Sequence, residues 1–203
     1  MNSKFKLGSI ELPYCYHEHN SSFRNERKVE VPLGAYFLDK FNNDVFEVGC
    51  VMPHYGRGEH TIIDLTDNHP RNIKANALHW DYTGKNVLSI STIEHFMTRE
   101  YGNGSNEDSI TCLSKIVTEA KNYLITFPTC YNEFLHQHMK SNAFIPRVML
   151  KRINQNENEW EQYFDFDNVD IEFGHWDGRN PDGKFNNANA EFIVTNLPEL
   201  LIR

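Results

Sequence analysis

Two acids in the segment from Asp44 to Asp67, DVFEVGCVMPHYGRGEHTIIDLTD, stand where side chains could bind a ligand. Glu47 lies early in one apolar run and Asp64 closes the next. Ligands of an open parallel sheet sit beyond the carboxyl ends of its strands, where an acid can accept hydrogen bonds from two ribose hydroxyls. Gly49 would let the backbone approach such a ligand closely, and Glu47 shares its side of the strand. A cap for the following turn is the competing interpretation of Asp64.

Apolar runs of strand length supply the elements that would position these acids. The runs are Val45–Val51, Thr61–Leu65, Asn86–Ser91, Tyr123–Phe127, Arg147–Arg152 and Ala190–Thr195. A helical face repeats over Ile110–Ala120. Near-continuous apolar strands alternating with helices predict an α/β fold, a mostly parallel sheet with helices on both faces. Only ten residues, MPHYGRGEHT, separate the first two runs, so the first connecting helix should be short or distorted.

The chain shows no repeat, low-complexity tract or linker that would divide it, and we expect one domain over residues 1–203. Residues 1–32 read as a polar, irregular N-terminal extension, near whose end Ser21 or Ser22 with Glu26 could start a helix. A short helix is predicted over Leu33–Phe41. Residues 153–189 are acidic, rich in Asn and dotted with aromatic residues. They predict an irregular insertion on the substrate side, either a lid that sets selectivity or a loop that closes over the core.

Composition and charge narrow the class of partner. The chain has 28 acidic and 20 basic residues and a net charge of −8, which argues against nucleic acid or an anionic membrane and favours a small-molecule or locally recognised substrate. No run approaches the roughly 20 apolar residues of a membrane span. The four cysteines form no CxxC pair, which is typical of a reducing compartment. We therefore expect a cytoplasmic protein, and the sequence leaves its oligomeric state open.

The order of five segments resembles a known family. EVGCVMPHY, IIDLTD, IKANALHWD, NVLSISTIEHF and LITFPTCYNEFL follow one another as in Rossmann-like S-adenosylmethionine-dependent methyltransferases. More narrowly, NERKVEVPL, SISTIEHF and TFPTCYNEFL resemble small bacterial methyltransferases associated with surface (capsular) polysaccharide biosynthesis. The resemblance covers Tyr14–Arg152 and implies a Rossmann-like methyltransferase fold.

The resemblance implies a cofactor site. Glu47 and Gly49 match the loop around the methionine end of S-adenosylmethionine, and Asp64 matches the acid on its ribose. The remaining matches are Asn76 and Ala77, near the adenine, and Ser89, beside the methyl-transfer site. Of the family's acid-x-Gly-x-Gly-x-Gly pattern one glycine remains, because positions 51 and 53 are Val and Pro. Asn76 replaces an acid but can accept from an adenine amino group, and the missing GxGxxG disfavours a dinucleotide.

Methyl transfer to a hydroxyl needs an aligned nucleophile and a base near neutrality. His95 is the best-placed base, and Glu94 could orient it or bind the substrate. Alternatively, Glu94 caps the next helix and His95 packs in its first turn. Tyr131 and Asn132 could hold substrate oxygens or stabilise their turn. His54 could contact the carboxylate of the cofactor or a phosphate of the substrate, or it could pack in its loop.

Two His-x-His pairs raise the question of a metal ion. The pairs are His17 with His19 and His136 with His138. The second pair reads as helical, and that spacing on a helix points the rings to different sides. Solvated polar loops explain both pairs, and no metal ligand is predicted.

Three functions are open, the first implied by the resemblance and the other two raised by the missing loop glycines and the histidine pairs. The first is a methyltransferase that methylates an oxygen of a carbohydrate or of a phosphorylated or nucleotide-linked precursor, including a capsule phosphoramidate. The second is a nucleoside-binding regulatory or scaffold protein that keeps the fold without turnover. In that case Glu94→Ala or His95→Ala would change nothing measurable. The third is a metal-dependent hydrolase, which a chelator would inactivate.

Overall fold

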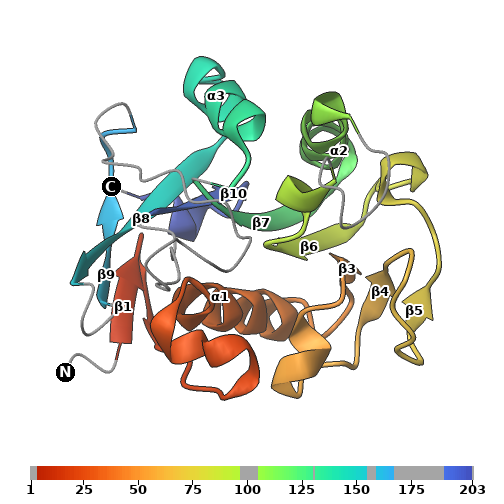
Figure 1. The fold of residues 1–203 in the computed structure, drawn as a ribbon, viewed down its shortest axis with the longest axis horizontal. Coiled ribbons are helices and arrows are strands. Elements are labelled where there is room, and N and C mark those ends of the chain that lie inside the picture. The colour runs from red at the N-terminus through yellow and green to blue at the C-terminus, as the bar shows by residue number, and fades with distance from the viewer. Residues whose placement is uncertain (1–3, 97–104, 130, 155–158, 167–189, 203) are drawn as a thin grey trace, which may run out of the picture.

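An eight-stranded sheet forms the middle layer of the protein (Figure 1). The computed structural model describes residues 4–96, 105–129, 131–154, 159–166 and 190–202. The strands are β3 (Phe46–Val48), β4 (Thr61–Ile63), β5 (Asn72–Ile73), β6 (Asn86–Ile90), β7 (Asn122–Pro128), β8 (Arg147–Asn154), β9 (Glu159–Tyr163) and β10 (Ala190–Thr195). Their order in space is β5-β4-β3-β6-β7-β10-β8-β9. The first five are parallel, β10 runs antiparallel between β7 and β8, and β9 is antiparallel to β8.

Helices cover both faces of this sheet. Helix α1 (Arg27–Lys40) packs on one face, and α2 (Asn106–Glu119) and α3 (Glu133–Ser141) pack on the other (Figure 1). Side chains of a strand alternate between faces, so β6 sends Leu88 into the α1 core and Val87 into the α2–α3 core. The predicted α/β fold with a mostly parallel sheet is thereby confirmed. In the described ranges no helix is both long and apolar enough to cross a bilayer.

Helix α1 contains a proline that its surroundings accommodate. Pro32 lacks the N–H that would bond to the carbonyl of Lys28 one turn earlier. That carbonyl instead accepts from the backbone N–H of Cys15 at 2.9 Å. The helix therefore runs through Pro32 and begins at Arg27, earlier than the predicted start at Leu33.

Local sequence signals account for the other helices. A capping box between Ser105 and Asp108 starts α2, and the Asn132 side chain accepts from the backbone N–H of Leu135 at the start of α3. Between β3 and β4 stands only the short 3-10 helix η2 (Met52–Tyr55), as the tight spacing predicted. Three more short helices are η3 (Ala77–His79), η4 (Ile93–His95) and η5 (Pro198–Leu200).

Two segments predicted to be irregular contain strands. Within residues 1–32, β1 (Lys4–Leu7) and β2 (Ile10–Pro13) form an antiparallel hairpin, and the short helix η1 (His19–Arg24) follows. Within residues 153–189, β9 pairs with β8 and buries Trp160. Of the remainder of this predicted insertion, residues 155–158 and 167–189 lie outside the described residues. Both predictions of irregular structure were wrong for these strands.

Candidate ligand-binding site

A cavity of about 560 Å³ opens at the carboxyl ends of β3, β4 and β6. After β3 the chain adds β4 on one side, and β6 then pairs on the other side of β3. Such a reversal of strand order is where open α/β sheets bind ligands. The lining comes from α1 and from the loops after these three strands and after β5. It includes Arg27, Gly49, Cys50, His54, Asp64, Asp67, Asn76, Ala77, Thr92 and His95.

Both the backbone conformation at position 49 and the close packing of Thr92 require a glycine there. Its φ is +86°, a conformation that side-chain-bearing residues rarely adopt. A Cβ there would lie 2.3 Å from Thr92 Oγ1, which in turn donates to the Ile90 carbonyl. The backbone thus lines the cavity directly at this position, as expected for a close approach to a ligand.

Asp64 lines the cavity and also caps its own turn. Its Oδ1 accepts from the backbone N–H of Thr66 at 2.7 Å, from the Thr66 hydroxyl at 3.0 Å and from the backbone N–H of Asp67 at 2.9 Å. The turn-capping interpretation therefore holds. Because these bonds all use Oδ1, Oδ2 is the oxygen that a ligand in the cavity could engage.

Asn76 and Ala77 line the cavity beyond the end of β5. The Asn76 side-chain oxygen accepts from the Leu78 N–H at 2.9 Å and so caps η3. This is the oxygen that the resemblance assigned to an adenine amino group. Its second lone pair is what such a contact would use.

Glu47 was predicted to bind the cofactor, but it does not line the cavity, and that prediction is corrected. Its side chain is fully buried, and its Oε1 accepts from the backbone N–H groups of Val51 at 3.1 Å and Met52 at 2.9 Å. Its Oε2 lies 2.7 Å from His60 Nε2, which is also buried. The carboxylate therefore shapes the loop that forms the cavity wall and is not available to a ligand. Ser89 is likewise buried away from the cavity, with its hydroxyl 3.4 Å from the Val48 carbonyl.

His95 lines the cavity, whereas Glu94 is buried behind it. Their closest approach is 3.7 Å, between His95 Nε2 and Glu94 Oε1. Burial, and then the positive charge of Arg27, lower the pKa of His95 to about 4. Burial raises the pKa of the Glu94 carboxyl well above its usual range. His95 is thus a neutral imidazole at pH 7 that can accept a proton, but it is a weak base.

The loop after β7 contacts both His95 and Glu94. The Tyr131 ring lies 4.4 Å from that of His95, between ring centres. Asn132 is buried, and its Nδ2 donates to the Glu94 carbonyl at 3.1 Å and to the Ser109 hydroxyl at 3.2 Å. Neither residue lines the cavity, so the predicted substrate contacts of Tyr131 and Asn132 are replaced by a structural role for Asn132 and a packing contact for Tyr131.

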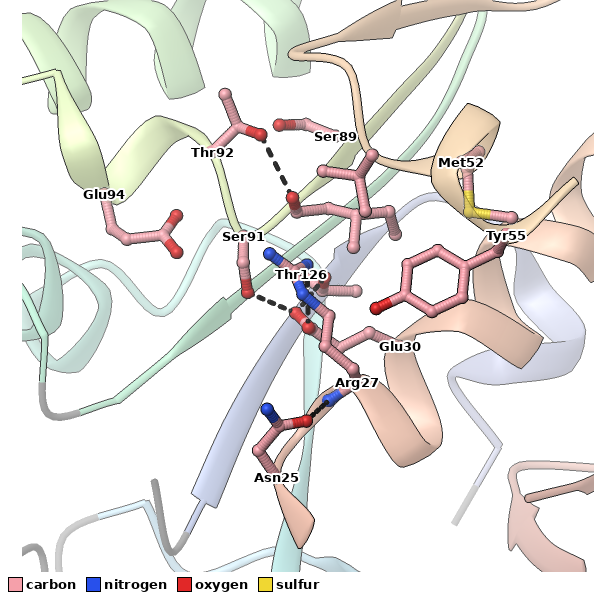
Figure 2. A network of polar contacts seen from close by, with 12 residues as sticks. Asn25, Arg27, Glu30, Met52, Tyr55, Ser89, Ser91, Thr92, Glu94 and Thr126 are labelled. Atoms are coloured by element: carbon pink, nitrogen blue, oxygen red, sulfur yellow. Dashed lines mark hydrogen bonds and ion pairs between the residues drawn. The ribbon is translucent and has the colours of Figure 1, made fainter. Parts of the chain in front are cut away.

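A polar network at the cavity floor was missed by the sequence analysis. Arg27 lines the cavity and donates through one terminal nitrogen to Glu30 Oε2 at 3.1 Å. Glu30 Oε1 accepts from the hydroxyls of Ser91 and Thr126, each at 2.6 Å (Figure 2). The spacing of Arg27 and Glu30, three apart on one helix, was the available signal. It was obscured because these residues were assigned to the N-terminal extension.

Two further carboxyl groups are buried near this network. Neither Glu94 nor Glu191 accepts a hydrogen bond from the residues that the structure describes. Burial, and next the negative charge of Glu30, raise the pKa of Glu191. A protonated Glu191 would have Glu30 as its neighbouring acceptor, so we expect it to be neutral in the folded protein.

The outer side of the cavity holds a thiol and a carboxyl group in contact. Burial, and then a hydrogen bond to Asp67, raise the pKa of the Cys50 thiol to about 12. His54 stands beside them on the cavity wall, its ring stacked on that of His19 at 4.6 Å between centres. The thiol is therefore protonated at neutral pH and donates to the carboxylate.

The cavity thus unites six of the predicted site residues and leaves five outside. Those on its wall are Gly49, His54, Asp64, Asn76, Ala77 and His95, whereas Glu47, Ser89, Glu94, Tyr131 and Asn132 do not line it. Comparisons of the chain with protein-family models, curated proteins and solved structures find no significant match.

Proposed function

We propose that the protein binds S-adenosylmethionine in this cavity and transfers its methyl group to an oxygen of a carbohydrate or of a small phosphorylated or nucleotide-linked precursor. A capsule phosphoramidate is one such precursor. One observation carries the proposal. Gly49, Asp64 and the Asn76–Ala77 pair come from three successive strand ends, and they line one cavity at the reversal of strand order.

The dimensions and chemistry of the cavity support a nucleoside cofactor. Its volume of about 560 Å³ lies within the range of small-molecule sites, about 300 to 1,000 Å³. Asp64 Oδ2 would accept from the ribose hydroxyls, and the backbone at Gly49 would pass close to the cofactor. The segment from Asn76 would face the adenine, with Ala77 and Leu78 giving it an apolar surface.

The acceptor side of the reaction would lie toward Arg27 and His95. In the transfer, the acceptor oxygen attacks the methyl carbon, the bond from sulfur to methyl breaks, and the hydroxyl proton passes to a base. His95 is neutral and can take that proton, while the Arg27 guanidinium is suited to hold acceptor oxygens. Glu94 would act only through the position of His95.

Calorimetric titration of the purified full chain with S-adenosylmethionine and S-adenosylhomocysteine tests the cofactor. We expect micromolar binding, about −8 kcal/mol, weakened about tenfold or more by Asp64→Ala. Asp81→Ala is the matched control, since Asp81 Oδ1 accepts from the Thr83 N–H at 3.0 Å in a similar turn but does not line the cavity. Absence of binding by folded wild-type protein would overturn the proposal.

A second candidate is a nucleoside-binding protein without turnover. The observation that favours it is the pKa of His95, lowered to about 4 by burial and by Arg27, which makes this residue a poor base near neutral pH. In this case the cofactor binds, but a panel of sugar, sugar-phosphate and nucleotide-sugar acceptors yields no S-adenosylhomocysteine. Acceptor-dependent product formation that His95→Ala reduces would exclude this candidate.

A further inference from the structure

Three different metal-binding side chains converge at the outer wall of the cavity. Cys50 follows β3, His54 lies in η2 and Asp67 follows β4. One ligand atom from each, sulfur, ring nitrogen and carboxylate oxygen, lies within 4.8 Å of the other two. This is the one such group of three found in the described part of the chain.

Other contacts hold these side chains in place. The His54 ring stacks on His19 with an angle of 7° between the ring planes. Asp67 Oδ1 accepts from the His69 N–H at 2.7 Å, and the Asp67 carbonyl accepts from Asn72 Nδ2 at 2.7 Å. Such outer contacts fix the orientation of metal ligands in known sites. These contacts thus fix the orientation of His54 and the position of Asp67.

We propose that Cys50, His54 and Asp67 bind a divalent metal ion of the zinc class at the cavity wall. Thiolate and imidazole ligands suit zinc, whereas magnesium and calcium prefer oxygen ligands alone. Tetrahedral zinc holds a sulfur and a nitrogen ligand about 3.5 Å apart. Small side-chain rotations therefore bring the three atoms from their present spacing to the ion, and the thiol proton leaves to solvent.

The cavity provides the remaining coordination position. Zinc sites that bind substrates have three protein ligands and a fourth position for water or a substrate group. Because Cys50, His54 and Asp67 all line the cavity, that fourth ligand would be water or an oxygen of a molecule bound there. The ligand class is thus a small hydroxyl- or oxyanion-bearing molecule.

The sequence did not predict this site. Cys50 and Asp67 are 17 positions apart and belong to no His-x-His or CxxC pattern. The structure brings them together because parallel β3 and β4 end at the same edge of the sheet. Metal binding needs none of the cofactor contacts, so the inference stands apart from the proposed function.

Titration of the metal-free full chain with Co²⁺, without any cofactor, tests the inference. We expect one ion to bind, with a thiolate-to-cobalt charge-transfer band and the strong visible bands of tetrahedral cobalt, and Zn²⁺ to displace it. Cys50→Ser should abolish the charge-transfer band. His54→Ala and Asp67→Asn should each weaken binding about tenfold or more.

Matched controls separate this site from other thiols and imidazoles. Cys15→Ser replaces another half-buried thiol, and His79→Ala another exposed imidazole. Both should bind Co²⁺ like the wild type. Lack of a charge-transfer band in the wild type, or an equal band in Cys50→Ser, would overturn the inference. His54 is exposed, so His54→Ala is expected to fold and remains informative if Cys50→Ser does not.

Discussion

Glu30 Oε1 lies 2.6 Å from the hydroxyl of Ser91, which joins helix α1 to the residue directly after β6. The same oxygen accepts from Thr126 of β7, and the other carboxylate oxygen accepts from Arg27 on the cavity wall. Glu30 is fully buried. This carboxylate therefore connects α1, the residue that follows β6, strand β7 and the cavity.

Replacing Glu30 should destabilise the whole domain. Glu30→Ala leaves the Arg27 guanidinium without its ion-pair partner and the two hydroxyls without their acceptor, a loss of about 3 to 5 kcal/mol in the free energy of unfolding. Urea denaturation measures it. Glu11→Ala, which breaks an exposed pair with Lys4, should cost about 0 to 1 kcal/mol. If Glu30→Ala and Glu11→Ala lowered the free energy of unfolding equally, the buried network would stabilise the fold no more than an exposed ion pair.

Gly49→Ala should destabilise the protein more than the same change at another glycine of similar backbone conformation. Gly56 has φ of +77° and nothing within 4 Å of an added Cβ, so Gly56→Ala reports the backbone cost alone. Gly49→Ala adds overlap with Thr92, about 1 to 3 kcal/mol more. Thermal denaturation of both variants gives the difference. Thr92→Ala in the Gly49→Ala background should recover part of it, and no recovery would contradict the clash.

Glu47 and Asp64 should respond differently to substitution. Glu47→Ala leaves the buried Met52 N–H, the half-buried Val51 N–H and the buried His60 ring without their partner, so it should lower the free energy of unfolding by about 1 to 3 kcal/mol or more. Asp64→Ala loses only turn contacts, about 1 kcal/mol, while it weakens cofactor binding. Denaturation and calorimetry on each variant separate the roles. Weakened binding in Glu47→Ala with unchanged stability would mean that Glu47 contacts the ligand directly.

The central strands could be predicted because their residues are buried on both faces. β6 and β7 read as near-continuous apolar runs for that reason. β5, with two residues, and β9, with a single fully buried position among polar ones, carry no such signal. Their pairing is decided by neighbouring strands that lie beside them only in the folded protein.

The sequence predicted those site residues that stand at the ends of recognisable strands. Gly49 and Asp64 close predicted strands and do line the cavity. Glu47 was misassigned because sequence cannot tell whether a carboxylate faces a ligand or the N–H groups of its own loop. Arg27 was missed because it was assigned to the N-terminal extension, before the helix predicted over Leu33–Phe41. The Cys15 N–H that bonds to the Lys28 carbonyl, and so accommodates Pro32 within α1, comes from the segment after β2.

Glu191 should make stability depend on pH in a particular direction. Burial and Glu30 raise its pKa in the folded state above the unfolded value of about 4.3. The folded state then binds more protons, so this group's contribution to stability is largest below that value and is lost as pH rises toward the folded pKa. Glu191→Gln mimics the neutral acid and removes this loss. Urea midpoints from pH 4 to pH 8 should therefore fall less steeply for Glu191→Gln than for wild type.

The acids around Glu191 decide how the pH comparison is interpreted. Glu26, Glu30 and Glu94 all raise its pKa by their charge, so protonation of any of them changes the slope as well. The difference between Glu191→Gln and wild type isolates the contribution of Glu191. Glu161→Gln, on the exposed side of β9, should follow the wild-type slope. If Glu191→Gln also showed the wild-type slope of urea midpoint against pH, Glu191 would be charged in the folded protein at neutral pH and would need a cation beside it.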